Sequence, residues 1–349
     1  MKVKLDDVCE RGSSNLKQSD VIDKEGDYPI YGAAGYIGNV EFYHQDKPYV
    51  AVVKDGAGIG RTTLHPAKSS VIGTMQYLIP KDNVLPEYLC YVVRYMHLEK
   101  YFTGATIPHI YFKDYKSEEF NLSSIENQKE IVSILSKVEK IIEDYQSELQ
   151  KLDDLIKARF VELFGESMTN PKGFPIKTIE EVAILNKGIT YSPEDVADEG
   201  IIVLRSSNIK GNIFDLEDLV KITKKISPDK YVQENDILMC NRNGSARLVG
   251  KVAMIPNLNE NMTFGTFMTI VRSDIHEYLF AFFQMDAFRE QIKFQTAVAI
   301  NQISLPLLAS VKVPIPPKEL IDEFATFTKQ VDKSGFDEVI HFVKYCLSI

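Results

Sequence analysis

A heptad pattern runs through residues 128–164 and constrains the fold more than any other feature of the chain. Its apolar positions alternate at spacings of four and three, and only Arg159 is out of class. They are Ile131, Leu135, Val138, Ile142, Tyr145, Leu149, Leu152, Ile156 and Leu163. No Gly or Pro interrupts the stretch before Gly165. The pattern predicts one continuous helix, about 55 Å long at about 1.5 Å per residue.

Such a helix carries a single apolar stripe that it cannot bury by itself. It therefore needs a second helix beside it. The pattern favours a coiled-coil spacer between two globular units, and the alternative is a long helix buried in an α-rich domain.

Composition limits the class of protein. A chain of 349 residues is long enough for two domains, each with its own core. No apolar run reaches the ~18 residues of a membrane span, and the first residues lack the apolar core of a secretory signal. The four cysteines form no CxxC pair, so we expect no zinc site or disulfide framework and a cytoplasmic location. The net charge of −9 means that any DNA contact must come from local patches.

The chain alternates between mixed regions and helices. Short strands broken by Gly and Pro, with a helix over 86–102, precede the heptads, and a second mixed region follows them. That second region has strands predicted at 201–204, 237–240, 252–255 and 267–271, and a helix over 275–294. The predicted divisions are a first domain (1–125), a spacer helix (126–164), a second domain (165–317) and a C-terminal helix (318–349).

The two halves show signs of an internal repeat. A shift of 193 places Glu130-Ile131-Val132 over Glu323-Phe324-Ala325, and Val138-Glu139-Lys140 over Val331-Asp332-Lys333. The domain starts also correspond, since Val3-Lys4-Leu5 is similar to Ile176-Lys177-Thr178-Ile179. Chance similarity between two amphipathic helices is the alternative explanation.

The order of several motifs resembles the specificity subunit of type I restriction-modification systems, over nearly the whole chain up to about Ser334. These motifs are Tyr28-Pro29-Ile30-Tyr31-Gly32 with Gly35-Tyr36-Ile37-Gly38; Asp55-Gly56-Ala57-Gly58-Ile59-Gly60; Thr106-Ile107-Pro108-His109; Asp236-Ile237-Leu238-Met239-Cys240; Leu248-Val249-Gly250-Lys251; and Pro316-Pro317 ahead of Glu323-Phe324 and Gln330-Val331-Asp332-Lys333-Ser334. The resemblance implies an α+β fold with two mixed α/β target-recognition domains, each reading half of a bipartite DNA sequence. Long coiled-coil helices between them would pair antiparallel and dock the modification subunits.

The same resemblance implies the partners and the chemistry. The chain would bind double-stranded DNA, methyltransferase (modification) subunits and a restriction subunit. It would be non-catalytic, with no cofactor or metal of its own, while its partners use S-adenosylmethionine, ATP and Mg.

The second long helix departs from the family pattern. Its pairing seam would continue through Phe324, Phe327 and Val331, but the next heptad positions are Ser334, Glu338 and His341, and Gly335 interrupts the helix. We therefore expect a helix truncated or divergent after 334. That would leave self-association through the bare seam open.

Polar residues after the apolar strand 237–240 are the strongest candidates for DNA contact in the second domain. Arg pairs with guanine and Asn with adenine in the major groove, and Lys holds phosphates. Those after the strand are Asn241, Arg242, Asn243, Arg247 and Lys251, and comparable candidates earlier in the domain are Arg205, Asn208 and Lys210. A solvated surface turn is the alternative interpretation.

In the first domain the candidates surround a glycine-rich loop at 56–60. They are Tyr31, Lys54, Arg61, Thr62, Lys68 and His109. A nucleotide-binding loop would require a helix to follow at once, but residues 62–66 are typical of a strand and turn. The glycines favour a tight loop that lets the backbone approach DNA.

The sequence contains no recognisable catalytic constellation. It lacks the Walker lysine, zinc-ligand spacing and the Asn-Pro-Pro-Tyr or Asp-Pro-Pro-Tyr stretch of amino-methyltransferases, and Ser227-Pro228-Asp229-Lys230 is more simply a turn than part of a nuclease site. A coiled-coil scaffold without DNA specificity is the competing function. A small-molecule enzyme would need a polar pocket that the sequence does not indicate.

Overall fold

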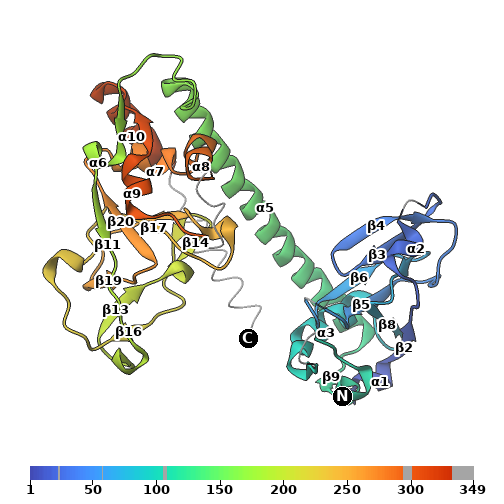
Figure 1. The fold of residues 1–349 in the computed structure, drawn as a ribbon. Helices are drawn as coiled ribbons and strands as arrows, with labels where there is room; N and C mark the ends of the chain where they lie inside the picture. Colours follow the sequence, from blue (N-terminus) through green and yellow to red (C-terminus); the bar gives the residue numbers. More distant parts are fainter. Residues whose placement is uncertain (23, 57, 105–107, 294–300, 332–349) are drawn as a thin grey trace. The chain divides into compact units, whose positions relative to one another are not determined.

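A computed structural model describes the chain except for residues 23, 57, 105–107, 294–300 and 332–349 (Figure 1). The chain divides into two compact units, of which the first is Met1–Tyr145 and the second begins at Gln146. The boundary lies inside one helix, α5 (Ile125–Phe164). Its range is the one in which the heptads predict a continuous helix.

The first unit is built on a four-stranded antiparallel sheet. Its central strand β5 (Tyr49–Val53) is an unbroken apolar run and is buried at all five positions, as expected for a strand covered on both faces. The strand order is β2 (Cys9–Ser13), β8 (Met75–Pro80), β5, β6 (Thr62–His65). A smaller sheet has the order β4 (Gly35–Val40), β3 (Tyr28–Gly32), β7 (Ser70–Val71), and β1 (Lys2–Lys4) pairs with β9 (Glu119–Asn121). The helices are α1 (Leu5–Val8), α2 (Gln18–Val21), α3 (Pro86–Tyr95) and α4 (Phe112–Tyr115).

The second unit contains a sheet of the same kind. Its order is β11 (Ile184–Lys187), β20 (Met268–Arg272), β17 (Ile237–Cys240), β18 (Val252–Met254). A second sheet has the order β12 (Val196–Ala197), β16 (Lys221–Ile222), β13 (Ile201–Leu204), β19 (Met262–Phe264). Two pairs are separate: β10 (Ile176–Thr178) with β21 (Lys312–Pro314), and β14 (Ile209–Lys210) with β15 (Ile213–Phe214). The helices are α6 (Ile179–Val182), α7 (His276–Phe282), α8 (Asp286–Lys293), α9 (Leu305–Ser310) and α10 (Lys318–Gln330).

The two units share one connectivity. All neighbours in β2-β8-β5-β6 and in β11-β20-β17-β18 are antiparallel. In the other sheets β3 pairs antiparallel with β4 and parallel with β7, just as β13 pairs antiparallel with β16 and parallel with β19. The order of strands therefore repeats, as the sequence repeat predicts.

Helix α5 is covered by a hydrophobic core at each end. Ile131 packs against the core of the first unit, whereas Phe160 and Phe164 lie in the core of the second. There the ring of Phe324, from α10, is 5.6 Å from Phe160 and 5.4 Å from Phe164, so these two helices do pack together.

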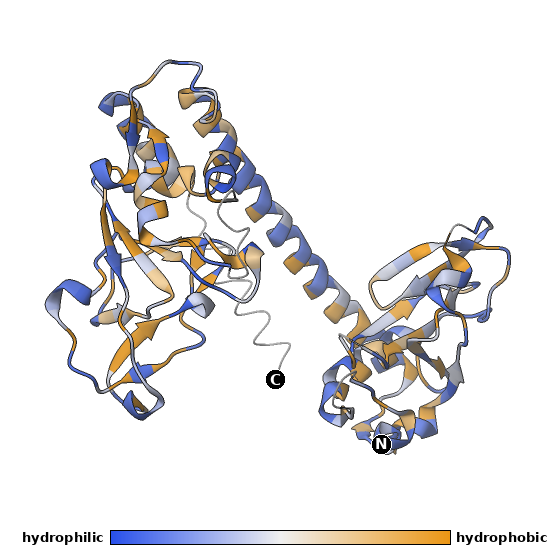
Figure 2. Ribbon diagram, in the orientation of Figure 1, coloured by the Kyte–Doolittle hydropathy of each residue, from blue (hydrophilic) through white to orange (hydrophobic). Residues whose placement is uncertain are grey.

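The middle of the stripe is covered less. Seam positions from Leu135 to Leu152 are half-buried and belong to neither core of the described residues. Figure 2 shows apolar positions recurring along this part of α5 between polar ones. The predicted divergence of the second helix after 334 lies outside the described residues.

Two predicted helices are broken in the structure. The helix predicted over 86–102 ends at Tyr95, because His97 is left-handed (φ 50°) and a 3-10 turn, Leu98–Tyr101, follows. The helix predicted over 275–294 is divided into α7 and α8. Phe282 and Phe283 are consecutive and both fully buried, and the break after them lets both rings enter one core. Among the described helices, none combines the length and apolarity needed to span a membrane.

Candidate nucleic-acid interface

The glycine-rich loop of the first unit leaves the end of the central strand β5. It closes on that strand through a hydrogen bond from the Gly60 N–H to the Val53 carbonyl (2.9 Å), and Gly60 has φ 82°. Strand β6 begins directly afterwards at Thr62, so no helix N-terminus faces the loop. This geometry is that of a tight turn and lacks the helix of a nucleotide-binding loop.

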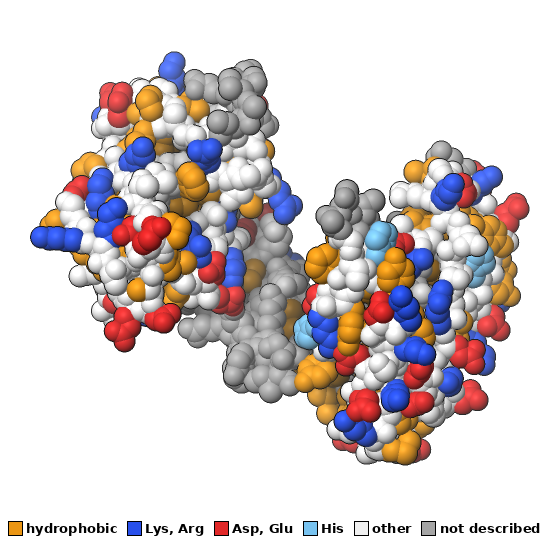
Figure 3. Space-filling model, turned by 60° about the horizontal axis from the view of Figure 1, so that its bottom comes forward, with side chains coloured by type: hydrophobic (Ala, Val, Ile, Leu, Met, Phe, Trp, Pro, Cys, Tyr) orange, Lys and Arg blue, Asp and Glu red, His pale blue; other side chains and the backbone are white. Residues whose placement is uncertain are grey.

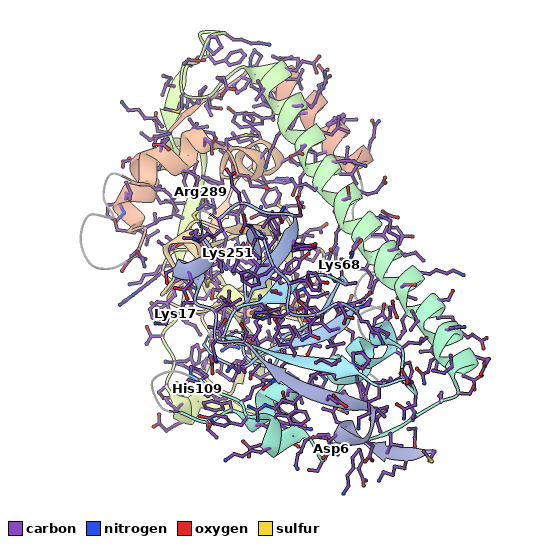
Figure 4. All side chains as sticks on the ribbon, turned by 90° about the vertical axis from the view of Figure 1, so that its right-hand side faces the viewer. Asp6, Lys17, Lys68, His109, Lys251 and Arg289 are labelled. Atoms are coloured by element: carbon purple, nitrogen blue, oxygen red, sulfur yellow. The ribbon has the colours of Figure 1, made fainter. Side chains whose placement is uncertain are left out.

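A second segment is tied to this loop. Asp55 and His109 form a single antiparallel β-bridge, and the Ile110 N–H donates to the Lys54 carbonyl (2.9 Å). The side chains also meet, because His109 Nδ1 is 2.7 Å from Asp55 Oδ1 (Figure 4 labels His109). A carboxylate only accepts, so Nδ1 carries a hydrogen and donates it to Asp55.

The second unit has the same arrangement after its central strand β17. Arg242 and Gln302 form a single antiparallel bridge, and the Ile303 N–H donates to the Asn241 carbonyl (2.8 Å). The Gly250 N–H closes the loop on the Cys240 carbonyl (2.7 Å), as Gly60 does on Val53, and Gly250 also has positive φ (77°).

The repeat register agrees with the match of His109 to Gln302, whereas Asp55 and Arg242 are 187 positions apart. Adding 193 to 109 gives 302, the residue that bridges Arg242, and both His109 and Gln302 lie three positions before a helix, α4 or α9. Asp55 and Arg242 each stand two residues beyond the central strand. The two units thus present a loop pair with the same β-bridge, with different side chains at the bridge and a loop that is three residues longer in the second unit.

The side chain of Arg242 is exposed and supported by an aromatic ring. Its guanidinium carbon is 5.2 Å from the centroid of Phe267, whose side chain is itself 52% exposed. The N–H groups of Asn241 and Arg242 both donate to the Phe267 carbonyl, at 2.8 and 3.3 Å. Backbone and ring together fix where the guanidinium is presented.

Arg242 borders two hollows in the second unit. The larger, of about 1220 Å³, is lined by aromatic and polar groups that include Tyr191, Arg205, Asn243 and Phe267. The smaller, of about 420 Å³, includes Asn241 and Gln302. Within the described residues, Arg205 Nε, Ser207 Oγ and Asn241 Oδ1 are buried and lack a hydrogen-bond partner.

Several predicted contact residues have structural roles, and we correct those assignments. Asn208 is fully buried, and its amide donates to the carbonyls of Asp215 (2.9 Å) and Asp218 (3.0 Å). The Lys251 ammonium, labelled in Figure 4, donates inward to the carbonyls of Ser206 and Ile209 (2.9 Å for the latter), and burial lowers its pKa. Because these donors are engaged inside the domain, they are not presented to DNA.

Two further candidates are buried. Asn241 is 7% exposed and its amide donates to the Thr269 hydroxyl. Thr62 is 4% exposed and its hydroxyl donates to the Gly60 carbonyl (3.0 Å). The Asn241 amide and the Thr62 hydroxyl are therefore engaged inside the second and first units, respectively, rather than presented to solvent.

The remaining candidates are wholly or partly at the surface. Lys68 and Arg247 are exposed. Arg61 donates to the Ala33 carbonyl (2.9 Å), Arg205 pairs with Asp218 (2.7 Å), and Lys210 pairs with Asp215 (3.1 Å). Tyr31 is half-buried against the ring of His65. The Lys54 ammonium lies 3.7 Å from the Asp55 carboxylate. The Asn243 amide donates to the Ser206 hydroxyl (3.2 Å). Figure 3 shows Lys and Arg interspersed with Asp and Glu on the faces in view.

Sequence reasoning missed the partners of the candidate side chains. Phe267 was predicted to begin a strand, but β20 begins at Met268 and leaves Phe267 exposed. Asp55 was treated as part of the glycine motif, and Gln302 was not singled out. The shift of 193 relates His109 to Gln302 and could have singled out Gln302, but it carries no signal for Phe267 or for the pairing of Asp55 with His109.

Two copies of one fold, each with a bridged loop pair and each holding part of one helix, define a tandem-domain protein. The sequence also matches the family model described as "Type I restriction modification DNA specificity domain" over residues 1–153 and 171–337. The chain therefore belongs to this family of type I specificity subunits.

Individual relatives agree with the family match. The chain is 28% identical over 189 residues to the type I restriction enzyme EcoKI specificity subunit of Escherichia coli (strain K12), covering 50% of this chain and 40% of that one. It is 22% identical over 313 residues to the MjaVIII specificity subunit of Methanocaldococcus jannaschii, covering 81% and 72%. The chain thus spans about two fifths of the length of the Escherichia coli relative.

A solved structure shows the same fold. The S subunit of a type I restriction-modification system from M. genitalium superposes with a TM-score of 0.56 at 16% identity, covering 100% of this chain and 95% of that one. This likeness confirms the predicted architecture of two mixed α/β domains with a long central helix.

Proposed function

We propose that this chain is the DNA-recognition subunit of a type I restriction-modification complex and reads a bipartite target, one half with each unit. The observation that carries the proposal is the duplicated loop pair, bridged at Asp55–His109 and at Arg242–Gln302. Repeated sites of one kind suit a target made of two parts, and sequence-dependent contacts come from side chains on such loops.

The continuous helix α5 supports a spacing role. Two half-sites at a fixed separation need a stiff connection, and 40 residues of helix span about 60 Å, or roughly 18 base pairs at about 3.4 Å each. A flexible linker would allow many separations. The helix length sets the scale of the footprint.

The proposal assigns the chemistry to partners. Methyltransferase subunits would dock on the helices and use S-adenosylmethionine, and a restriction subunit would use ATP and Mg. The chain itself would be non-catalytic and would supply the choice of sequence.

The test is to produce the full chain with its methyltransferase subunit in a host and to map the methylated bases of the genome. We expect one motif of two parts separated by a fixed number of unspecified bases. Exchanging residues 1–125 for those of a relative should change one part and leave the other. A one-part motif, or a change in both parts, would contradict the proposal.

The half-buried middle of the α5 stripe favours a second candidate, a coiled-coil scaffold without DNA specificity. DNA binding over a salt series separates the two functions, because phosphate contacts make affinity fall steeply with salt. A scaffold would show no salt-dependent binding to duplex DNA and would associate with itself through the helix.

A further inference from the structure

The two residues joined by the single β-bridge, Asp55–His109 in the first unit and Arg242–Gln302 in the second, differ in chemistry between the units. In the first unit the bridged position after the central strand holds a carboxylate, Asp55, which orients the imidazole of His109. In the second unit it holds a guanidinium, Arg242, opposite the neutral amide of Gln302. The β-bridge is shared, although the loop from Cys240 to Gly250 is three residues longer than that from Val53 to Gly60. The side chains at the bridge differ in charge and in hydrogen-bonding groups.

The Arg242 side chain is prepared for a planar partner. Its guanidinium lies over the Phe267 ring, and within the part of the chain that the structure describes no carboxylate pairs with it. Asp218, the acid that lines the same hollow, is engaged by Arg205 (2.7 Å). Stacking leaves the donor edge of a guanidinium free, so that edge can be presented to a ligand.

We propose that Arg242, supported by Phe267, reads a guanine in the half-site bound by the second unit. This inference rests on the proposed DNA-recognition function and names a specificity-determining residue within it. Guanine is the base whose major-groove edge offers two acceptors, N7 and O6, at the spacing of a guanidinium fork. A phosphate could also accept from this fork, but such a contact would be independent of sequence.

Arg247 provides a matched control. It is an exposed arginine in the same loop and has the same charge, but it lies outside the position that repeats in the first unit. Replacing it removes the same charge without removing the bridged position. Loss of affinity through charge alone is therefore separated from loss of base discrimination.

The experiment uses the full chain with its methyltransferase subunit. Methylated motifs are mapped for the unaltered chain and for Arg242→Gln and Arg247→Gln, and Kd is then measured for duplexes that carry or lack each guanine of the second half-site. For Arg242→Gln we expect discrimination at one guanine to fall about 5- to 150-fold, with the first half-site unchanged. Phe267→Ala should weaken the same discrimination, and Arg247→Gln should leave it intact.

The inference is overturned if Arg242→Gln lowers affinity for every duplex equally, which would make Arg242 a phosphate contact. It is also overturned if the variant melts at the wild-type temperature and keeps all base preferences. Failure of the proposed function looks different, because the unaltered chain would then give no two-part motif.

Discussion

Polar side chains in this fold divide into those that hold loops and those that face outward, and burial decides which is which. Asn208 and Lys251 have residue types suited to DNA contact, yet their donors end on backbone carbonyls inside the second unit. Residue type alone predicts both roles equally well. The two roles are distinguished by hydrogen-bond partners such as the Asp215 and Asp218 carbonyls. These partners are brought close only by the tertiary fold, which the local sequence pattern does not predict.

The buried role of Asn208 leads to a stability prediction. Asn208→Ala removes the donor to two carbonyls that are shielded from water, so we expect a loss of about 1–3 kcal/mol in the free energy of unfolding. Urea unfolding measures it. The exposed Asn257→Ala is the control and should change stability by less than about 0.5 kcal/mol. Equal effects in both variants would show that the Asn208 hydrogen bonds do not stabilise the fold.

A charged cluster joins α7 to α10. Glu277 lies 2.9 Å from His276 Nε2 and 3.4 Å from Lys329 Nζ. The hydrogen bond that His276 donates to the Glu277 carboxylate raises the pKa of His276. Burial raises the pKa of Glu277, but its contacts with His276, its own backbone and Lys329 outweigh burial and lower the pKa to about 2.

These shifts predict two pH windows. The carboxyl contribution of Glu277 is complete above its ordinary value of 4.5 and is lost as the pH falls toward about 2. The His276 contribution is complete below 6.5 and is lost as the pH rises through the raised pKa. Urea midpoints over pH 2–8 should show both losses in the wild type and a smaller acid loss in Glu277→Gln. Glu260→Gln is the control, and an unchanged acid profile in Glu277→Gln would refute the assignment.

At the scale of elements, the long helix and the repeat were predictable, whereas the loop partners were not. Heptads are a local signal, so Ile125–Phe164 follows from spacing alone. The buried run of β5 was equally plain. Phe267 was misassigned because one residue decides whether an apolar side chain begins a strand or stands outside it, and strand ends are poorly encoded locally.

Helix length leads to a prediction about spacing. Duplicating residues 146–152 adds one heptad, which lengthens α5 by about 10.5 Å while turning it by only about 20°. We expect the unspecified gap in the methylated motif to grow by about three base pairs, with both half-sites unchanged. Genome-wide mapping of methylated bases measures the gap, and an unchanged gap would mean that α5 does not set it.

For the whole molecule, the proposed DNA binding has to be compatible with a net charge of −9. Cationic and anionic side chains are interspersed on the faces that Figure 3 shows, so the proposed contact with DNA would depend on a few local cations. This mixture is why the overall charge gave no positive indication of function.

The dependence of DNA affinity on salt concentration measures how many cationic side chains contact phosphates. Replacing exposed Lys68 or exposed Arg247 by Gln should in each case reduce the steepness of the fall of log affinity with log salt by about 0.9, if the residue contacts a phosphate. Fluorescence anisotropy with the target duplex, at about 50–200 mM salt, measures the slope. Glu234→Gln leaves the cations in place and should not lower it. An unaltered slope in both cation variants would exclude them from the interface.

The boundary between the two units falls within α5, where no loop separates Tyr145 from Gln146. A single added or lost codon there would shift the axis by only about 1.5 Å but swing everything beyond it by about 100°. Point substitutions would be harmless by comparison. Over generations, the gene should therefore change in length at this place by seven or eleven codons at a time, the steps that nearly restore the helical phase.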